Sequence, residues 1–163
     1  MKVGIIGGGA SGMMSAILLS RKGIDVTIIE KNSILGKKIL MTGNGRCNYF
    51  NQDIDIDKYY TSDDEFLKTI VNEDNVLKVK EFLNSIGLVP RIKNGYYYPM
   101  SNTATSVLNA FLTEIERLKI KTILDSEING IKKIENKYQV LVNGKKMLFD
   151  KIIISIGSKA GLK

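Results

Sequence analysis

The feature that most constrains the fold of this chain is a glycine-rich segment close to its start. An apolar run at residues 3–6 (VGII) is followed by GGGASG at residues 7–12, and then by a helical pattern over residues 13–22 that ends at Gly23. The next run, residues 25–29, is rich in β-branched side chains and ends at Glu30. A strand, a glycine turn, a helix and a second strand in this order predict a βαβ unit with parallel strands.

The residues of the GGGASG segment have separate physical roles. Gly7 allows a sharp turn after the strand, Gly9 lets a pyrophosphate approach the backbone, and Gly12 lets the helix lie close to the strands. The helix would start at Ala10 and Ser11, where free N–H groups and the positive end of the helix dipole attract anions. We therefore expect all five residues to hold the diphosphate of a dinucleotide. The alternative is a glycine turn in an ordinary βαβ unit that binds nothing.

Glu30 lies where such folds carry an acidic residue, 18 positions after Gly12. A carboxylate at the tip of the second strand can accept hydrogen bonds from both ribose hydroxyls of an adenosine, and it repels a 2′-phosphate. The first nucleotide is therefore expected to be FAD or NAD rather than NADP.

Composition indicates a globular protein without a membrane span. The 163 residues suit one domain, 44% are apolar and 25% are charged, and no apolar run is long enough to cross a bilayer. Lys2 followed by apolar residues resembles the start of a signal peptide, but the glycines interrupt its apolar core. A single cysteine, Cys47, cannot form an intramolecular disulfide. These features predict a cytoplasmic protein.

The net charge of +7 raises the question of a nucleic-acid partner. The lysines are scattered and form no basic run, so a lysine-rich solvated surface is favoured over a nucleic-acid face. The chain has no histidine, which excludes a histidine-ligated metal site, and one cysteine cannot form a thiolate cage. We expect no metal centre.

Residues 31–48 form a long segment with almost no helical or strand period. Long irregular segments in compact domains are usually functional or disordered, and this one is too apolar for disorder. Its glycines permit unusual backbone angles, while its lysines, asparagines and arginine supply hydrogen-bond donors and positive charge. Such a loop could wrap a dinucleotide and meet the pyrimidine edge of a flavin, whereas NAD needs no such wrap. The alternative is a surface loop held by its own side chains.

The middle of the chain predicts a small helical insertion and a hairpin. The acidic stretch over residues 51–70 lacks the offsets of a calcium loop and is expected to be a solvated connection. Asp63 and Asp74 are each expected near the start of a helix; the expected buried side of the second helix is Val76, Leu77, Val79, Phe82, Leu83 and Ile86. Residues 88–92 and 96–98 are predicted strands around an Asn-Gly turn, with Tyr97 facing away from the neighbouring tyrosines.

The last third predicts the remaining parts of a nucleotide-binding sheet. Apolar residues at helical spacing predict a helix over 107–118, which leads to a third parallel strand at 121–124. Three short runs, residues 126–134, 138–142 and 146–149, predict a β-meander. A buried strand at 151–155 then leads to a turn at Gly157.

Three segments together resemble a bacterial flavoprotein family. They are TGNGRCN at residues 42–48 with GKK before it at 36–38, GYYYPMSN at 95–102 and IIISIGS at 152–158. The family consists of NAD(P)/FAD-dependent oxidoreductases and includes aminoacetone-oxidase-like proteins and bile-acid-pathway reductases. The order and spacing of the segments match along the whole chain, except that Ser158 stands where the family usually has a second glycine.

The resemblance implies FAD as cofactor, with NAD(P)H as a candidate reductant and a small-molecule substrate that the sequence does not identify. It implies that the loop toward the flavin is lined by Lys31, Lys38, Gly43, Asn44, Arg46, Cys47 and Asn48. It also implies that the backbone of Ile128 lies beside the adenine and that Gly157 lies close to the cofactor. No catalytic residue is implied. A redox role for Cys47 would need a second cysteine for dithiol exchange, so packing is the favoured role.

Members of this family run more than twice as long as this chain. The resemblance therefore implies that residues 1–163 are an FAD-binding domain whose inserted substrate domain and C-terminal strands lie outside the sequence. A sheet that lacks these strands would expose an edge, and such an edge favours self-association.

The sequence thus predicts an α/β, Rossmann-like FAD/NAD(P)-binding domain with a parallel sheet, a β-meander, a small helical insertion and helices on both faces of the sheet. The predicted function is the FAD-binding portion of a flavin-dependent oxidoreductase. Two alternatives remain: an NAD-binding module without flavin, and a non-enzymatic interaction or nucleic-acid-binding domain.

Overall fold

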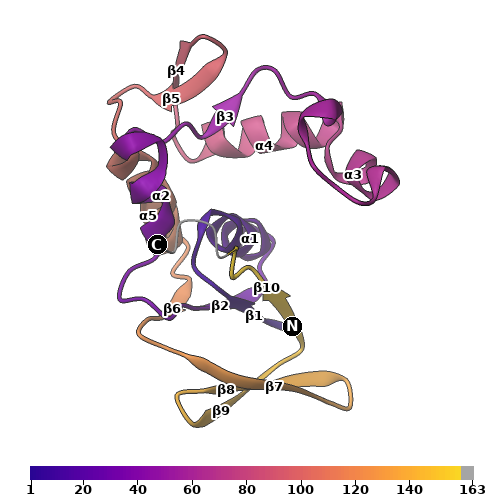
Figure 1. Ribbon diagram of the computed structural model, residues 1–163. Coiled ribbons are helices and arrows are strands. Elements are labelled where there is room, and N and C mark those ends of the chain that lie inside the picture. Colours follow the sequence, from indigo (N-terminus) through magenta and orange to yellow (C-terminus); the bar gives the residue numbers. More distant parts are fainter. Residues whose placement is uncertain (159–163) are drawn as a thin grey trace. The chain divides into compact units, whose positions relative to one another are not determined.

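The computed structural model describes residues 1–158, which divide into two compact units (Figure 1). The first unit consists of Met1–Ile39 and Phe111–Lys163, and the second consists of Leu40–Ala110. The chain therefore leaves the first unit after the glycine-rich segment and the two strands around it, and returns to it within a helix.

The first unit is built on a parallel sheet of four strands in the order β10-β1-β2-β6. The strands are β1 (Lys2–Ile6), β2 (Asp25–Ile29), β6 (Lys121–Ile123) and β10 (Lys151–Ile154). In β1, Ile6 pairs with Ile29 of β2 on one side and with Ile154 of β10 on the other. The predicted parallel sheet is confirmed, and the two strands that flank the glycine segment lie next to each other in it.

Helices cover one face of this sheet. The crossover helix α1 (Ala10–Arg21) joins β1 to β2 and buries Met13, Ala16 and Ile17 completely. The helix ends where the sequence predicts, because Gly23 adopts a φ of +74°. Helix α5 (Ala104–Arg117) begins in the second unit and ends in the first, where Glu114 pairs with Arg21 of α1.

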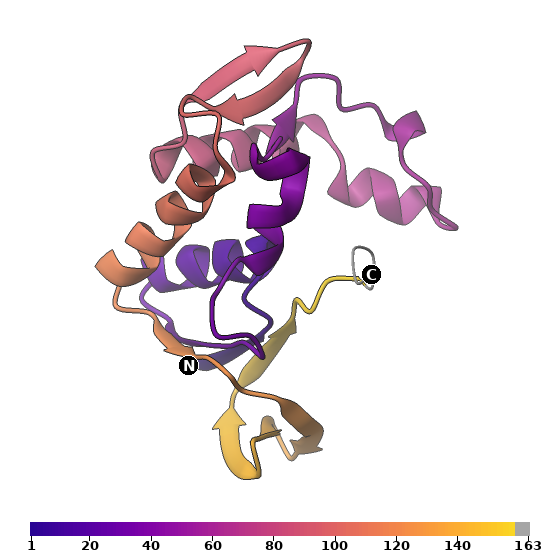
Figure 2. The same cartoon turned by 60° about the vertical axis from the view of Figure 1, so that its left-hand side comes forward.

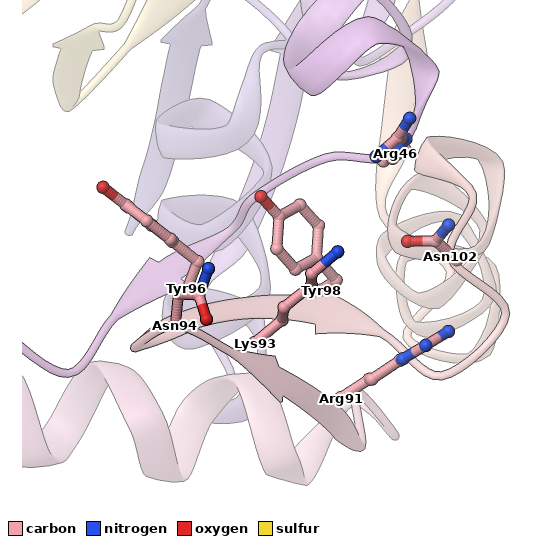
Figure 3. A pocket seen from close by; sticks show the side chains of 7 residues that line it. All are labelled: Arg46, Arg91, Lys93, Asn94, Tyr96, Tyr98 and Asn102. Carbon is pink, nitrogen blue, oxygen red and sulfur yellow. The ribbon is translucent and has the colours of Figure 1, made fainter.

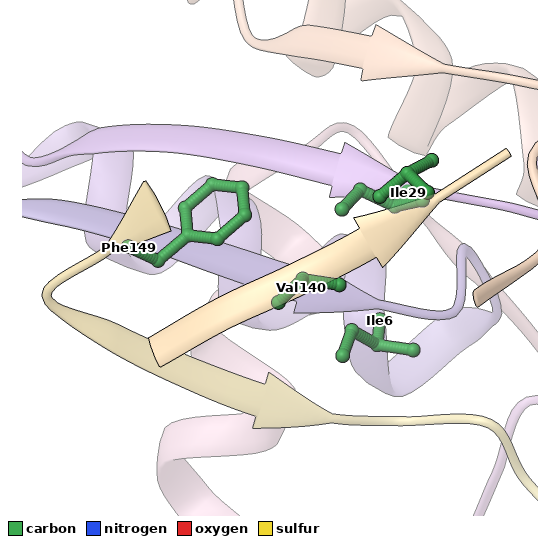
Figure 4. Packing of buried hydrophobic residues seen from close by; sticks show 5 residues of the cluster. Ile6, Ile29, Val140 and Phe149 are labelled. Atoms are coloured by element: carbon green, nitrogen blue, oxygen red, sulfur yellow. The ribbon is translucent and has the colours of Figure 1, made fainter. Parts of the chain in front are cut away.

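A three-stranded meander covers the other face (Figure 4). It consists of β7 (Ile128–Ile134), β8 (Lys137–Val142) and β9 (Lys145–Phe149), paired antiparallel. Val140 and Phe149 pack in one buried cluster with Ile6 and Ile29. A Cβ on Gly4 would lie 2.8 Å from the Phe149 ring, so the ring rests directly on β1. The expectation of helices on both faces is therefore wrong for residues 1–158.

The second unit holds an antiparallel sheet in the order β3-β5-β4. Its strands are β3 (Phe50–Asn51), β4 (Pro90–Lys93) and β5 (Tyr96–Pro99), and Asn94 and Gly95 form the expected turn with φ values of 52° and 81°. Helix α4 (Glu73–Ser85) runs along this sheet in both views (Figure 2). The Lys80 ammonium lies 5.2 Å from the centre of the Phe50 ring.

Both helices of the insertion begin at side-chain caps. Asp63 accepts a hydrogen bond from the Phe66 N–H at the start of α3 (Asp64–Ile70), and Asn72 accepts one from the Asn75 N–H at the start of α4. The predicted helices are confirmed. One burial prediction is wrong, because Leu77 of α4 is 55% exposed.

Residues 31–48 contain more regular structure than predicted. They form the short helix α2 (Lys37–Met41), followed by the 3₁₀ turn η1 (Thr42–Gly45); a second 3₁₀ turn, η2 (Ile56–Lys58), lies further on. A helix of five residues spans little more than one turn, so it leaves no apolar period in the sequence.

Within residues 1–158, no helix combines the length and apolarity that crossing a membrane requires.

Candidate functional site

Two glycines of the loop at residues 7–12 are fixed by the packing of the protein itself. Gly7 has a φ of +104°, and a Cβ there would lie 2.5 Å from the carbonyl oxygen of Ser155. A Cβ on Gly12 would lie 2.0 Å from the carbonyl oxygen of Gly7. These contacts bring the start of α1 against the ends of β1 and β10, which is the close helix–strand packing expected of Gly12.

Gly9 differs from these two glycines because the space beside it is open. A Cβ built on Gly9 meets no atom within 4 Å, and its φ of −76° suits any residue. The protein therefore has no packing reason for a glycine at this position. Its N-cap position tolerates glycine, and the open space also leaves the backbone accessible to a ligand.

The N-terminus of α1 has no side-chain cap. Its N-cap residue is Gly9, no side chain accepts a hydrogen bond there, and the first turn carries no acidic residue. By contrast, α3 and α4 have a capping side chain and two acidic residues each. The N–H groups at the start of a helix need acceptors, and an uncapped end attracts an anion. The side chains of Ala10 and Ser11 are exposed at this end.

Glu30 is buried against the glycine loop and is 8% exposed. Its Oε2 accepts a hydrogen bond from the Gly8 N–H at 2.7 Å, and its Oε1 accepts two from Asn32, from the backbone N–H at 2.8 Å and from Nδ2 at 2.5 Å. A carboxylate has about four acceptor positions, so three are used and one remains. Glu30 thus ties the loop to β2 and has one acceptor position left.

The second glycine of the motif, Gly8, has a role that sequence reasoning missed. Its carbonyl accepts a hydrogen bond from the Gly36 N–H at 2.7 Å, and a Cβ on Gly8 would lie 2.3 Å from Cδ2 of the buried Leu35. The one feature of the sequence that could have indicated this role is the extra glycine inside the G-x-G-x-x-G pattern. Gly8 therefore fixes the segment after Glu30 against the glycine loop.

The structure brings Lys38 and Gly157 together. The Lys38 ammonium donates a hydrogen bond to the carbonyl of Ser158 at 2.6 Å. A Cβ on Gly157 would lie 3.5 Å from Nζ of Lys38. Gly157 has a φ of +71°, which accounts for the predicted turn after β10. Lys31 is exposed directly after Glu30. These residues all belong to the first unit, as does the glycine loop.

Ile128 is the first residue of β7, where it pairs with Val142 ahead of a bulge at Gly130. Its side chain packs against the buried cluster beneath the sheet. Just before it, the Ser126 N–H donates to the Glu30 carbonyl at 2.9 Å, so this part of the chain passes the end of β2. The predicted contact of the Ile128 backbone with adenine stays a prediction.

The remaining predicted site residues lie in the second unit, in a tight turn over residues 42–48. Gly43, Asn44 and Cys47 all adopt positive φ values, of 55°, 53° and 57°. The Arg46 N–H donates to the Gly43 carbonyl at 3.2 Å, and a Cβ on Gly43 would lie 3.3 Å from the backbone nitrogen of Asn48. The turn therefore holds these five residues close to one another.

Cys47 is buried at the end of this turn and is 5% exposed. Burial raises the pKa of the Cys47 thiol, and a hydrogen bond with Thr42 partly offsets this. Burial also raises the pKa of the neighbouring Tyr49 to about 12, with smaller contributions from Tyr97 and Cys47. A buried, protonated thiol suits packing better than nucleophilic or redox chemistry. Among residues 1–158, no cluster of acidic and cysteine side chains forms a metal site.

A parallel sheet, a glycine turn that leads into an uncapped helix, and a buried acid at the end of the next strand define a Rossmann-type nucleotide-binding domain. The model of the HI0933-like protein Rossmann domain matches residues 1–162. The chain belongs to this family.

Relatives with names come from several bacteria and archaea. The 3-dehydro-bile acid delta(4,6)-reductase of Clostridium scindens is 37% identical over 161 residues, which cover 98% of this chain and 39% of that protein. The ribosomal RNA dihydrouridine synthase of Escherichia coli is 27% identical over 94% of this chain and 38% of that protein. This chain thus spans about two fifths of the length of these relatives.

Solved structures share the fold. The 3-ketosteroid-delta4-(5alpha)-dehydrogenase of Rhodococcus jostii superposes with a TM-score of 0.70 at 14% identity, over 96% of this chain and 45% of that one. CtdE in complex with FAD superposes with a TM-score of 0.58 at 20% identity, over 98% of this chain and 39% of that one. At these identities the likeness concerns the fold.

Proposed function

We propose that this chain is the FAD-binding portion of a flavin-dependent oxidoreductase. The observation that carries the proposal is the uncapped N-terminus of α1, which begins at Gly9, a glycine that no packing contact requires. The relative from Clostridium scindens carries the name of a reductase, and CtdE was solved with FAD, which supports a flavin as the bound nucleotide. When bound, FAD supplies the redox chemistry, while the protein supplies position and electrostatics.

The residues of the first unit have defined tasks in this proposal. The N–H groups at Ala10, Ser11 and Gly12 donate to the diphosphate, aided by the positive end of the helix dipole. Glu30 accepts a hydrogen bond from one ribose hydroxyl with its remaining acceptor position. Lys38 holds the turn at Gly157 in place through its hydrogen bond to Ser158.

The turn over residues 42–48 is proposed to reach toward the flavin, with NAD(P)H as the proposed reductant. If the turn contacts the flavin, the Asn44→Ala variant should bind FAD more weakly in the fluorescence titration described below. The chain spans 39% of the reductase it resembles, and no small-molecule substrate is assigned to it.

The sharpest test is a Gly9→Asp variant. An aspartate at an N-cap accepts hydrogen bonds from the first helical N–H groups, as Asp63 does for α3. We expect the free energy of unfolding to change by less than about 0.5 kcal/mol, because glycine is itself a tolerated N-cap. We expect FAD affinity to fall at least about tenfold, because the carboxylate takes the donors and repels the diphosphate. Urea unfolding and a fluorescence titration with FAD measure the two effects.

Gly130→Asp is the matched control for added charge, because Gly130 also has open space around it and lies in β7. It should leave FAD binding unchanged. The proposal is wrong if Gly9→Asp binds FAD as the unaltered protein does. If the unaltered protein binds NAD but not FAD in the same titration, the NAD-binding alternative replaces it.

A further inference from the structure

The hairpin of the second unit gathers cationic and tyrosine side chains on one face. In the antiparallel register, Arg91 of β4 lies opposite Tyr98 of β5, and Lys93 lies opposite Tyr96. Residues directly opposite each other share a face of the sheet, so the two cations and the two tyrosines lie on the same side (Figure 3). The other side carries Tyr97, whose ring meets Phe50 edge-on at 5.3 Å.

These side chains line a pocket of about 240 Å³ that lies wholly within the second unit. Arg46 adds a third cation from the turn over residues 42–48 (Figure 3). The amides of Asn94, from the hairpin turn, and Asn102, just before α5, complete the lining. Arg46 lies more than forty positions before the other lining residues in the sequence, and the fold of this unit brings it to them.

The pocket carries positive charge without a compensating acid. All three of its charged residues are cations, and no aspartate or glutamate lines it. Over residues 1–158, none of the ion pairs involves Arg46, Arg91 or Lys93, whereas Lys58, Lys78 and Arg117 each have an acidic partner. The three cations are exposed, and a bound anion would compensate their charge.

The chemistry of the lining suits one class of anion. Two guanidinium groups and one ammonium match a phosphate monoester, which carries a charge of about −1.5 to −2 near neutral pH and several acceptor oxygens. The two tyrosine rings offer flat faces for a planar group, and the two amides can donate to or accept from its polar edge. A single carboxylate would leave most of these donors unused.

We propose that this pocket is a second binding site, separate from the glycine loop, which takes a phosphate monoester attached to a planar ring. A nucleoside monophosphate is the ligand class that combines these parts. None of its lining residues belongs to the first unit, which holds the glycine loop; one of them, Arg46, lies in the turn over residues 42–48.

The test is a calorimetric titration of the 163-residue chain with UMP, combined with amide NMR spectra of the same samples. UMP should bind, and uridine and ribose 5-phosphate should each bind at least about tenfold more weakly, because each lacks one recognised part. The amide signals of Asn94, Gly95 and Asn102 should shift on UMP addition. Those of Gly9, Ala10 and Ser11 should not.

Variants separate this pocket from the general surface charge. Arg91→Gln should weaken UMP binding about tenfold, which is the usual effect of losing a charged hydrogen bond. Lys93→Gln should weaken it less, and Tyr98→Leu should reduce the preference for UMP over ribose 5-phosphate. Lys132→Gln is the matched control, since it removes the same charge from an exposed strand position of the first unit. It should have no effect, and Arg91→Gln should leave the FAD titration unchanged.

Several results would overturn the proposal. Inorganic phosphate binding as tightly as UMP would reveal an adventitious anion site without ring recognition. Equal losses in Arg91→Gln and Lys132→Gln would reveal attraction by net charge alone. Shifts confined to residues 7–12 would place UMP in the glycine loop, and a loss of FAD affinity in Arg91→Gln would make the pocket part of the FAD site.

Discussion

Gly9 and Gly12 are three residues apart and have opposite reasons to be glycine. At Gly12 the reason is internal, because a Cβ would lie 2.0 Å from the Gly7 carbonyl oxygen and 2.7 Å from Ser155 Oγ. At Gly9 the structure leaves open space. The packing role that the sequence predicts for Gly12 is therefore confirmed, whereas the binding role of Gly9 stays a prediction.

Gly12→Ala should destabilise the protein although alanine is the better helix former. Alanine gains about 1 kcal/mol in helix propensity, whereas overpacking against backbone costs typically about 1–3 kcal/mol, and a 2.0 Å contact with a carbonyl lies at the severe end. We expect a net loss in the free energy of unfolding, measured by urea titration. Gly9→Ser is the control and should be nearly neutral, because Gly9 is the N-cap of α1 and serine is favoured there. A Gly12→Ala variant as stable as the unaltered protein would contradict the packing described here.

The residues around Glu30 show how far sequence reasoning reached. The position of the acid after β2 was predictable from its distance to the glycines, and the structure places it against the loop. Its bonds to Asn32 and the contact between Gly8 and Leu35 were not predictable, since they depend on how residues 31–36 fold back. No pattern in the sequence specifies that path.

Elements with a clear period were predicted well, and elements without one were not. The alternation around Tyr97 gave the correct face for all three tyrosines, and the β-branched run gave β2 with its observed ends, Asp25–Ile29. Helix α2 was not predicted, because five residues are too few to show a helical repeat of apolar positions. The prediction of helices on the second face of the sheet was wrong, because the meander covers that face. The residues around Val140 and Phe149 in the sequence do not indicate which element these two side chains pack against.

Helices α1 and α5 are joined by a cluster of charges around Glu114. Arg117 Nε donates to Glu114 Oε2 at 2.7 Å, and Arg21 Nε donates to Glu114 Oε1 at 2.8 Å. Hydrogen bonds from Arg117 and Arg21 lower the pKa of the Glu114 carboxyl to about 2, against the opposing effect of burial. The carboxylate is 8% exposed, so solvent screens this cluster less than an exposed pair.

This cluster should make stability fall in acid. Because the folded-state pKa is depressed, the stabilisation is present above the unfolded pKa of about 4.3 and is lost as pH falls through the folded value. We expect a loss of about 2 kcal/mol between about pH 5 and pH 2, measured by urea unfolding. Glu114→Gln should remove most of this dependence, and Glu116→Gln, an exposed neighbour, should not. Identical pH profiles for the two variants would argue against the cluster.

The parallel sheet of the first unit ends at β10 on one side, and in residues 1–158 this strand pairs with β1 alone. Two large apolar side chains stand out here, since Ile154 is 60% exposed and Ile156 is 68% exposed. An unpaired strand edge that carries apolar side chains is a template for pairing with another chain.

We expect this edge to cause concentration-dependent self-association of the 163-residue chain, observable by analytical ultracentrifugation. Ile154→Lys should shift the equilibrium toward monomer, because a lysine on an edge strand opposes pairing. Leu77→Lys is the matched control, since it replaces a similarly exposed aliphatic residue on helix α4. A chain that stays monomeric at all concentrations would rule out this edge as an association surface.

The pairing of β1 with β10 also has a consequence for synthesis on the ribosome. Val3 pairs with Lys151, so the partners lie 151 − 3 = 148 positions apart. Gly7 likewise packs against the backbone of Ser155. Translation runs from the N-terminus, and contacts between distant residues form late and slowly. The glycine loop therefore leaves the ribosome long before the strand that supports it. During that interval one side of β1 stays unpaired in the nascent chain, and this is the period in which a chaperone would matter most.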